Sequence, residues 1–215
     1  MSATINQNYL KLNESYLFAE IARRIREWQS AHPELSSQLI RMGIGDVTRP
    51  LPKSVVDAMV KAAQEMGVAE TFRGYGPEQG YDFLKTAIQS YYKKFGVELA
   101  LDEIFISDGA KSDLGNILDL FDANNTVLVT DPVYPVYVDT NMMSGRKIVY
   151  AMSSEENGFL PLPAPEYRAD IIYLCSPNNP TGAVYDREGL TKWVRFAQEN
   201  NAILLFDAAY ECFVT

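Results

Sequence analysis

Residues 202–210 read Ala202-Ile-Leu-Leu-Phe-Asp-Ala-Ala-Tyr210, and this stretch indicates the fold of the chain. Five apolar residues run without a break into a carboxylate, Asp207, and a phenol follows three positions later. A continuous apolar run predicts a strand covered on both faces, as in the parallel sheet of an α/β protein. Open sheets of this kind bind ligands at the carboxyl ends of their strands, so Asp207 is a candidate ligand contact. Asp is also common in turns and at N-caps, so this stretch alone leaves both roles open.

The composition is that of a globular protein with an excess of acidic residues. The sequence has 215 residues, of which 47% are hydrophobic and 22% charged, and its formal net charge is −9. The acidic balance argues against nucleic acid as a partner. The N-terminus lacks the apolar core of a secretory signal and no apolar stretch is long enough to span a bilayer, so we expect a cytoplasmic protein without membrane contact. Cys175 and Cys212 lack metal-ligand spacing, and we predict no metal site.

Three stretches in the first hundred residues have apolar residues at helical spacing, which predicts amphipathic helices. These stretches are residues 16–29, residues 52–67 beginning at Pro52, and residues 81–95. We expect the second helix to bury a stripe of apolar side chains, formed by Val55, Val56, Met59, Val60 and Ala63.

Glycine-rich segments connect these helices. Residues 39–42 predict a short strand that ends in Gly43-Ile-Gly-Asp46, which suits either a plain tight turn or a close approach of a ligand to the backbone. Arg73-Gly-Tyr-Gly-Pro-Glu-Gln-Gly80 predicts a loop. Tyr75 lies in this loop between two glycines, so its ring can reach outward from the chain.

From Glu103 onward, predicted strands alternate with predicted helices. The strands cover residues 104–106, 126–130, 147–150, 170–175 and 202–206. The helices cover residues 113–121, 137–143 and 187–200. This succession predicts an α/β fold with a doubly wound, mainly parallel sheet and helices on both of its faces.

Several of these strands are followed by residues that suit a ligand. The strand at 104–106 leads through Gly109 into Ala110 and Lys111 at the start of a helix, where free N–H groups favour a phosphate. In Asp131-Pro-Val-Tyr-Pro-Val-Tyr137, two prolines restrict the backbone around Tyr134, whose ring then suits stacking on a flat ligand. In Ser176-Pro-Asn-Asn-Pro-Thr-Gly182, the prolines stiffen the turn that carries Asn179.

Together these groups predict a site for a planar ring that carries a phosphate and a basic nitrogen. Asp207 would pair with the nitrogen and keep it protonated, since a nearby carboxylate favours the charged form. Asn179 and Tyr210 would bind an oxygen on the ring, and Tyr134 would stack on its face. Pyridoxal 5'-phosphate fits all of these contacts, and an Asp partner for its ring nitrogen is usual in proteins.

The motifs resemble those of class I/II aminotransferases of fold type I. Ser176-Pro-Asn-Asn-Pro-Thr-Gly182 and Asp207-Ala-Ala-Tyr210 are similar to the asparagine and aspartate–tyrosine motifs of that family, in its order and spacing. Ser107-Asp-Gly-Ala-Lys111 with Arg73-Gly-Tyr-Gly-Pro77 is similar, more narrowly, to the LL-diaminopimelate aminotransferase group. The similarity covers nearly the whole chain. It implies reversible amino transfer between LL-diaminopimelate and 2-oxoglutarate, with small amino acids and 2-oxo acids as substrates.

The resemblance also implies roles for single residues. The backbone of Ala110 and Lys111 would bind the phosphate of the cofactor, and Tyr75 would reach that phosphate across the interface of a homodimer with shared active sites. Tyr16, Gly45 and the side chain of Lys111 would line the substrate pocket. In the family, the lysine that binds the cofactor covalently and the arginine that binds the substrate carboxylate lie beyond the Asp–Tyr motif. We therefore assign no catalytic residue and expect the 215-residue chain alone to be inactive.

The family implies a layout in which residues 1–50 form an N-terminal arm and part of the small domain. Residues 51–215 would form the first part of the large cofactor-binding domain, so the sequence resembles the N-terminal half of an aminotransferase. Two alternatives remain open. One is a class I/II aminotransferase acting on aromatic or branched amino acids, and the other is a non-catalytic module in which the cofactor cradle serves folding or dimerisation.

Overall fold

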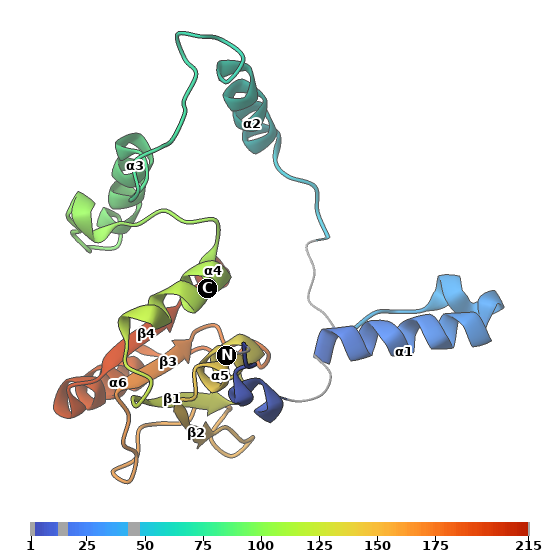
Figure 1. The fold of residues 1–215 in the computed structure, drawn as a ribbon, viewed down its shortest axis with the longest axis vertical. Coiled ribbons are helices and arrows are strands. Elements are labelled where there is room, and N and C mark those ends of the chain that lie inside the picture. The colour runs from blue at the N-terminus through green and yellow to red at the C-terminus, as the bar shows by residue number, and fades with distance from the viewer. Residues whose placement is uncertain (1–2, 13–16, 43–47, 215) are drawn as a thin grey trace. The chain divides into compact units, whose positions relative to one another are not determined.

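The computed structural model describes residues 3–12, 17–42 and 48–214 (Figure 1). The chain divides into two compact units. The first, here called the sheet unit, consists of Met1–Leu12 and Ser107–Thr215. The second, the helical unit, consists of Asn13–Ile106. The glycine-rich bend predicted at 43–46 lies outside the described residues.

The sheet unit is built on four parallel strands in the order β2-β1-β3-β4 (Figure 1). The strands are β1 (Thr126–Asp131), β2 (Lys147–Met152), β3 (Ile171–Cys175) and β4 (Ile203–Asp207). The unit also contains the helices and 3-10 turns η1 (Gln7–Lys11), α4 (Ala110–Asn116), η4 (Ile117–Leu120), α5 (Pro135–Met143), α6 (Arg187–Asn200) and η5 (Glu211–Phe213).

Helices cover both faces of this sheet. Alternate side chains of each strand point to opposite faces, so each strand contributes to two apolar clusters. On one face, Leu128 and Ile172 pack in a cluster with Trp193 of α6. On the other face, Val129 packs in a cluster with Tyr137 of α5. The prediction of a doubly wound parallel sheet is confirmed.

The strand β4 lies at the edge of the sheet and is only half covered. All five residues of β3, the neighbouring strand, are buried. In β4, by contrast, Ile203 and Phe206 are 45% and 46% exposed. The prediction that the 202–206 strand is covered on both faces is therefore wrong for this chain. An apolar run predicts a strand, but whether that strand is buried depends on the elements that pack around it. In the described part of the chain, no strand pairs with the outer edge of β4.

The helical unit contains α1 (Leu17–Ala31), η2 (Pro33–Gln38), α2 (Lys53–Glu65), α3 (Asp82–Lys93) and η3 (Leu101–Glu103). The three predicted helices are present, but the predicted burial of α2 is wrong. Its whole apolar stripe is exposed, namely Val55, Val56, Met59, Val60 and Ala63. Helical periodicity identifies an apolar face, whereas burial requires a partner for that face.

Two predicted strands do not form. Residues 39–42 follow η2 without a strand assignment, and residues 104–106 are not part of a ladder either. Ile104 is buried, and the N–H of Ile106 donates to the carbonyl of Gln79 at 3.0 Å. A single extended segment needs a neighbouring strand, and none of the described residues of the helical unit forms one.

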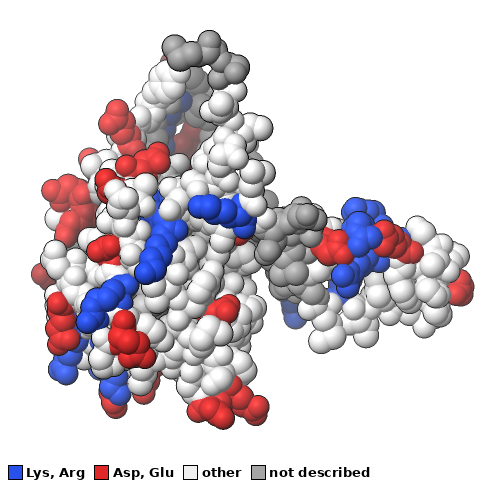
Figure 2. Space-filling view, turned by 60° about the horizontal axis from the view of Figure 1, so that its bottom comes forward, with Lys and Arg blue, Asp and Glu red and all other residues white. Residues whose placement is uncertain are grey.

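The surface mixes charges of both signs. On the face drawn in Figure 2, basic side chains form a short row with acidic side chains around it. No helix within residues 3–12, 17–42 and 48–214 is both long and apolar enough to cross a membrane.

Candidate functional site

The carboxylate of Asp207 is fixed by two hydrogen-bond donors. Asp207 is the last residue of β4 and pairs in register with Cys175 of β3. Its Oδ1 accepts from the N–H of Ala209 at 3.0 Å, and its Oδ2 accepts from the hydroxyl of Tyr137 at 2.6 Å. Each oxygen therefore has one protein donor and retains a lone pair for a ligand.

Tyr137 is a functional candidate that sequence reasoning missed. It lies on α5, is buried, and stacks on the ring of Tyr173 with centroids 4.9 Å apart. The amide of Asn141 supports this pair, because its Nδ2 donates to the Tyr137 carbonyl at 2.7 Å and to the Tyr173 hydroxyl at 3.3 Å. Burial, and next the hydrogen bond to Asp207, raise the pKa of the Tyr137 phenol far above its usual value. Tyr137 is therefore a neutral donor at physiological pH.

Tyr134 and Tyr137 contact each other through their rings. The centroids are 5.7 Å apart and the planes make an angle of 85°, an edge-to-face arrangement. Tyr134 is the N-cap residue of α5, and Pro135 occupies the first position of the helix. Residues three positions apart lie on the same face of a helix, so a helix that begins at Pro135 places Tyr134 and Tyr137 on one side. This was the one signal in the local sequence that could have linked the two tyrosines.

The loop after β3 is joined to the loop after β1 by Asn178, a second residue that sequence reasoning missed. Asn178 is buried, and its Nδ2 donates to the carbonyl of Pro132 at 3.2 Å and to the hydroxyl of Thr181 at 2.9 Å. Its Oδ1 is buried and has no hydrogen-bond partner among the described residues. The predicted ligand contact, Asn179, is half buried, and its side chain bonds to no other residue that the structure describes.

The start of α4 presents unused N–H groups. Gly109 is the N-cap at φ 149° and ψ 157°, a conformation that essentially only glycine adopts. The hydroxyl of Ser107 accepts from the N–H of Gly109 at 3.2 Å and donates to Asp113 Oδ2 at 2.6 Å. Within the described backbone, the N–H groups of Ala110 and Lys111 find no acceptor. Such N–H groups favour an anion.

Four other residues were predicted for the site, namely Tyr210, Tyr75, Tyr16 and Gly45. Tyr210 follows β4 and is 41% exposed. Tyr75 belongs to the helical unit, which is described separately from the sheet unit. Tyr16 and Gly45, the predicted substrate contacts, lie outside the described residues.

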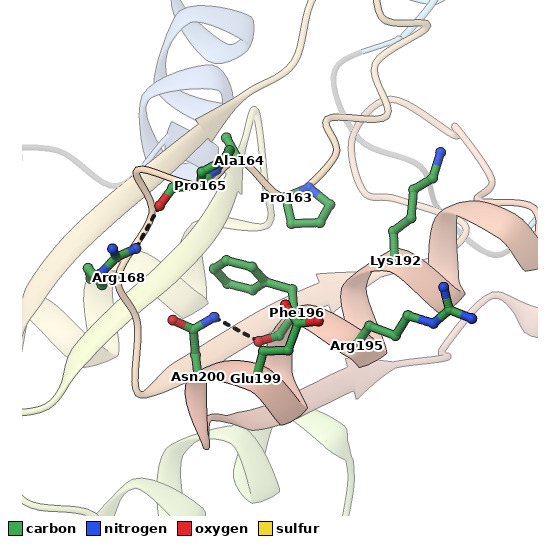
Figure 3. Close-up of a pocket in the computed structure, with 9 residues that line it drawn as sticks. All are labelled: Pro163, Ala164, Pro165, Arg168, Lys192, Arg195, Phe196, Glu199 and Asn200. Atoms are coloured by element: carbon green, nitrogen blue, oxygen red, sulfur yellow. Dashed lines mark hydrogen bonds between the residues drawn. The ribbon is translucent and has the colours of Figure 1, made fainter.

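A cavity of about 610 Å³ lies against α6 in the sheet unit (Figure 3). Phe196 forms part of its wall, and Arg168, Lys192 and Arg195 lie around it. Two of these cations already have partners, since Arg168 donates to the Pro165 carbonyl at 2.7 Å and Lys192 pairs with a glutamate of its own helix at 2.7 Å. Among the predicted site residues that the structure describes, none lines this cavity.

Comparisons with known proteins agree on one family. The sequence model of the family described as aminotransferase class I and II matches residues 37–215. The whole chain is 54% identical to an LL-diaminopimelate aminotransferase of Methanosphaera stadtmanae, of which it covers 54%. The structure of L,L-diaminopimelate aminotransferase from Chlamydomonas reinhardtii is similar with a TM-score of 0.90 and 44% identity, over 100% of this chain and 55% of that one.

A more distant solved structure has the same architecture. BacF from Bacillus subtilis, in its apo form, matches with a TM-score of 0.79 and 29% identity, over 97% of this chain and 53% of that one. The chain thus spans about half the length of the relatives it matches.

Proposed function

The chain belongs to the class I and II aminotransferase family, and on that premise we propose that it forms the cofactor-binding part of a pyridoxal-phosphate-dependent aminotransferase. The fold type I expectation is confirmed by the likeness to the Chlamydomonas enzyme. The observation that carries the proposal is the carboxylate of Asp207, held at the end of β4 by the neutral hydroxyl of Tyr137.

The residues present fit this cofactor. The phosphate would bind the unused N–H groups of Ala110 and Lys111. The ring oxygen would accept from the Asn179 amide, which has no described partner, and from the hydroxyl of Tyr210. The ring nitrogen would bind Asp207, whose two oxygens each keep a lone pair.

When bound, pyridoxal phosphate supplies an electron sink for the bond that breaks at the α-carbon of the substrate. The protein supports this chemistry by holding a proton on the ring nitrogen, which the Asp207 carboxylate does by charge. Tyr137 fixes the direction of that carboxylate without adding charge, because its phenol stays neutral. Tyr134, packed edge-to-face on Tyr137, would hold the cofactor ring flat.

The proposed reaction is the transfer of an amino group between an amino acid and a 2-oxo acid. The specific pair we propose is LL-diaminopimelate and 2-oxoglutarate, because the relative at 54% identity is an LL-diaminopimelate aminotransferase. We also propose a homodimer in which the fully exposed Tyr75 reaches the partner's cofactor phosphate, and Tyr16, Gly45 and the Lys111 side chain line the substrate pocket. In this proposal, residues 1–50 form an N-terminal arm and part of the small domain, and residues 51–215 form the first part of the large cofactor-binding domain.

The test uses the full-length protein, meaning this chain together with the remaining length that its relatives have. We expect cofactor absorbance in the purified protein and glutamate formation from LL-diaminopimelate and 2-oxoglutarate. Aromatic or branched amino acids should react much more slowly, and faster turnover of either class would replace the proposed substrate. A full-length protein that binds no pyridoxal phosphate would contradict the proposal as a whole.

A further inference from the structure

Tyr75 projects fully into solvent from the loop between α2 and α3. Its exposed fraction is 109%, so none of the side chain is covered. Gly74 and Gly76 flank it, and the backbone of glycine is the least restricted of any residue. A side chain in this setting loses much conformational entropy when it binds a ligand, unless the rest of the loop restricts it.

Arg73 restricts the start of this loop. Its guanidinium carbon lies 5.4 Å from the ring centroid of Tyr81 and 5.1 Å from that of Phe83, within the range of a cation–π contact. The two rings stack on each other with centroids 5.5 Å apart and planes 20° apart. The guanidinium also lies 3.6 Å from Glu65 Oε2, at the last residue of α2. One side chain therefore joins the end of α2 to the start of α3.

The other side of the loop returns to the same ring. A Cβ added at Gly76 would lie 3.2 Å from Cε2 and 3.4 Å from the hydroxyl oxygen of Tyr81, so the backbone passes close to the hydroxyl end of that ring. Gly80 closes the loop at φ 99°, where an added Cβ would lie 2.3 Å from Ile106. Both segments that flank Tyr75 are thus held against Tyr81, and Tyr75 lies at the turn between them.

We propose that Arg73 is a positioning residue that holds the loop closed on Tyr81 and so presents the hydroxyl of Tyr75 to the cofactor phosphate. This inference rests on the proposed function, in which Tyr75 binds that phosphate. The guanidinium suits the role, because it lies within cation–π range of two aromatic rings while it pairs with a carboxylate. Arg73 acts through Tyr75, and its own charge is directed at the rings and at Glu65.

The test is a double-mutant cycle on the dissociation constant of pyridoxal phosphate in the full-length protein. We expect Tyr75→Phe to raise the dissociation constant about tenfold, as the loss of one hydrogen bond to a charged group predicts. Arg73→Ala should raise it about fivefold when Tyr75 is present and leave it unchanged in the Tyr75→Phe protein. Arg73→Lys keeps a cation over the rings and should restore part of the affinity.

A matched control separates positioning from general stability. Arg23 is half exposed like Arg73, and its ion pairs within the described part of the chain are with Glu20 and Glu27 of its own helix. Arg23→Ala should leave the dissociation constant unchanged, and neither alanine variant should shift the thermal midpoint of the cofactor-free protein.

Three outcomes would overturn the inference. Additive effects of Arg73→Ala and Tyr75→Phe would mean that Arg73 acts independently of Tyr75, for example on the phosphate itself. An unchanged affinity in Tyr75→Phe would remove the residue through which Arg73 is proposed to act, and unchanged affinity in Arg73→Ala would remove Arg73. Each of these outcomes leaves cofactor binding by the unsubstituted protein intact. If the unsubstituted full-length protein does not bind pyridoxal phosphate, the proposed function itself is contradicted.

Discussion

The hydroxyl of Tyr137 lies 2.6 Å from Oδ2 of Asp207, although 70 positions separate the two residues in the chain. The contact joins α5, which follows β1, to the carboxyl end of β4. Parallel strands bring their carboxyl ends to one edge of the sheet, so helices that start at that edge can reach a carboxylate on another strand. Tyr137 also contacts Tyr134, so one buried ring touches two of the predicted cofactor residues.

The first prediction concerns this contact. Tyr137→Phe keeps the stack on Tyr173 but removes the donor to Asp207. In the full-length protein we expect kcat to fall at least tenfold with little change in KM, the scale of one hydrogen bond to a charged group. Steady-state kinetics at saturating cofactor would measure this. The control is Tyr185→Phe, which removes a buried hydroxyl that donates at 2.6 Å to the Pro161 carbonyl and should leave kcat unchanged. A Tyr137→Phe enzyme with wild-type kcat would exclude the role.

The second prediction concerns Asp207 itself. Asp207→Asn keeps the shape of the side chain but removes the charge that holds a proton on the ring nitrogen. We expect the full-length variant to retain the cofactor and to lose roughly two decades of transamination rate, about 2.7 kcal/mol. Asp186→Asn is the matched control, because Asp186 caps α6 through the N–H of Gly189, and an asparagine can do the same. Activity of the Asp207 variant within threefold of wild type would remove this residue from the mechanism.

The sequence predicted those parts of the fold that depend on local pattern. The bounds of α6 were predicted as 187–200, and the structure gives Arg187–Asn200, because the spacing of its apolar residues is a property of the segment itself. Three predictions were wrong for a common reason, namely the strands at 39–42 and 104–106 and the burial of α2. Each depends on a partner elsewhere in the chain, and the pattern of one segment does not indicate whether that partner is present.

The residues of the candidate site also form two groups, those that the sequence could predict and those that it could not. The positions of Asp207 and Asn179 near strand ends could be predicted, because Asp207 directly follows an apolar run and Asn179 lies in the turn that begins after another such run at Cys175. Tyr137 and Asn178 could not, since the contacts that define them cross 70 and 46 positions of the chain. Asn179 was predicted as a ligand contact, but nothing in the sequence indicated that its neighbour Asn178 joins two loops.

The third prediction concerns pH. Burial is the main cause that raises the pKa of the Tyr185 phenol to about 12, from an ordinary value of 10.0. Its neutral form therefore stabilises the folded state fully below pH 10, and this contribution is lost as the pH rises through about 12. Denaturant unfolding of the full-length protein between pH 9 and 12 should show stability falling more steeply than in Tyr185→Phe. Equal slopes in the two proteins would show that the Tyr185 phenol is not protected from ionisation.

The last prediction concerns the 215-residue chain in isolation. β4 has an outer edge that pairs with no described strand, and Ile203 on it is half exposed, so the edge offers free backbone groups beside an apolar side chain. Such edges associate with one another. We expect sedimentation velocity to show concentration-dependent association of the isolated chain. Ile203→Lys should reduce the association, because a charge on an edge strand opposes edge-to-edge pairing. Thr86→Lys, which adds the same charge at an exposed polar position of α3, should not. A monodisperse monomer with a cooperative thermal transition would mean that the edge needs no further cover, and that the sheet of this chain is complete with four strands.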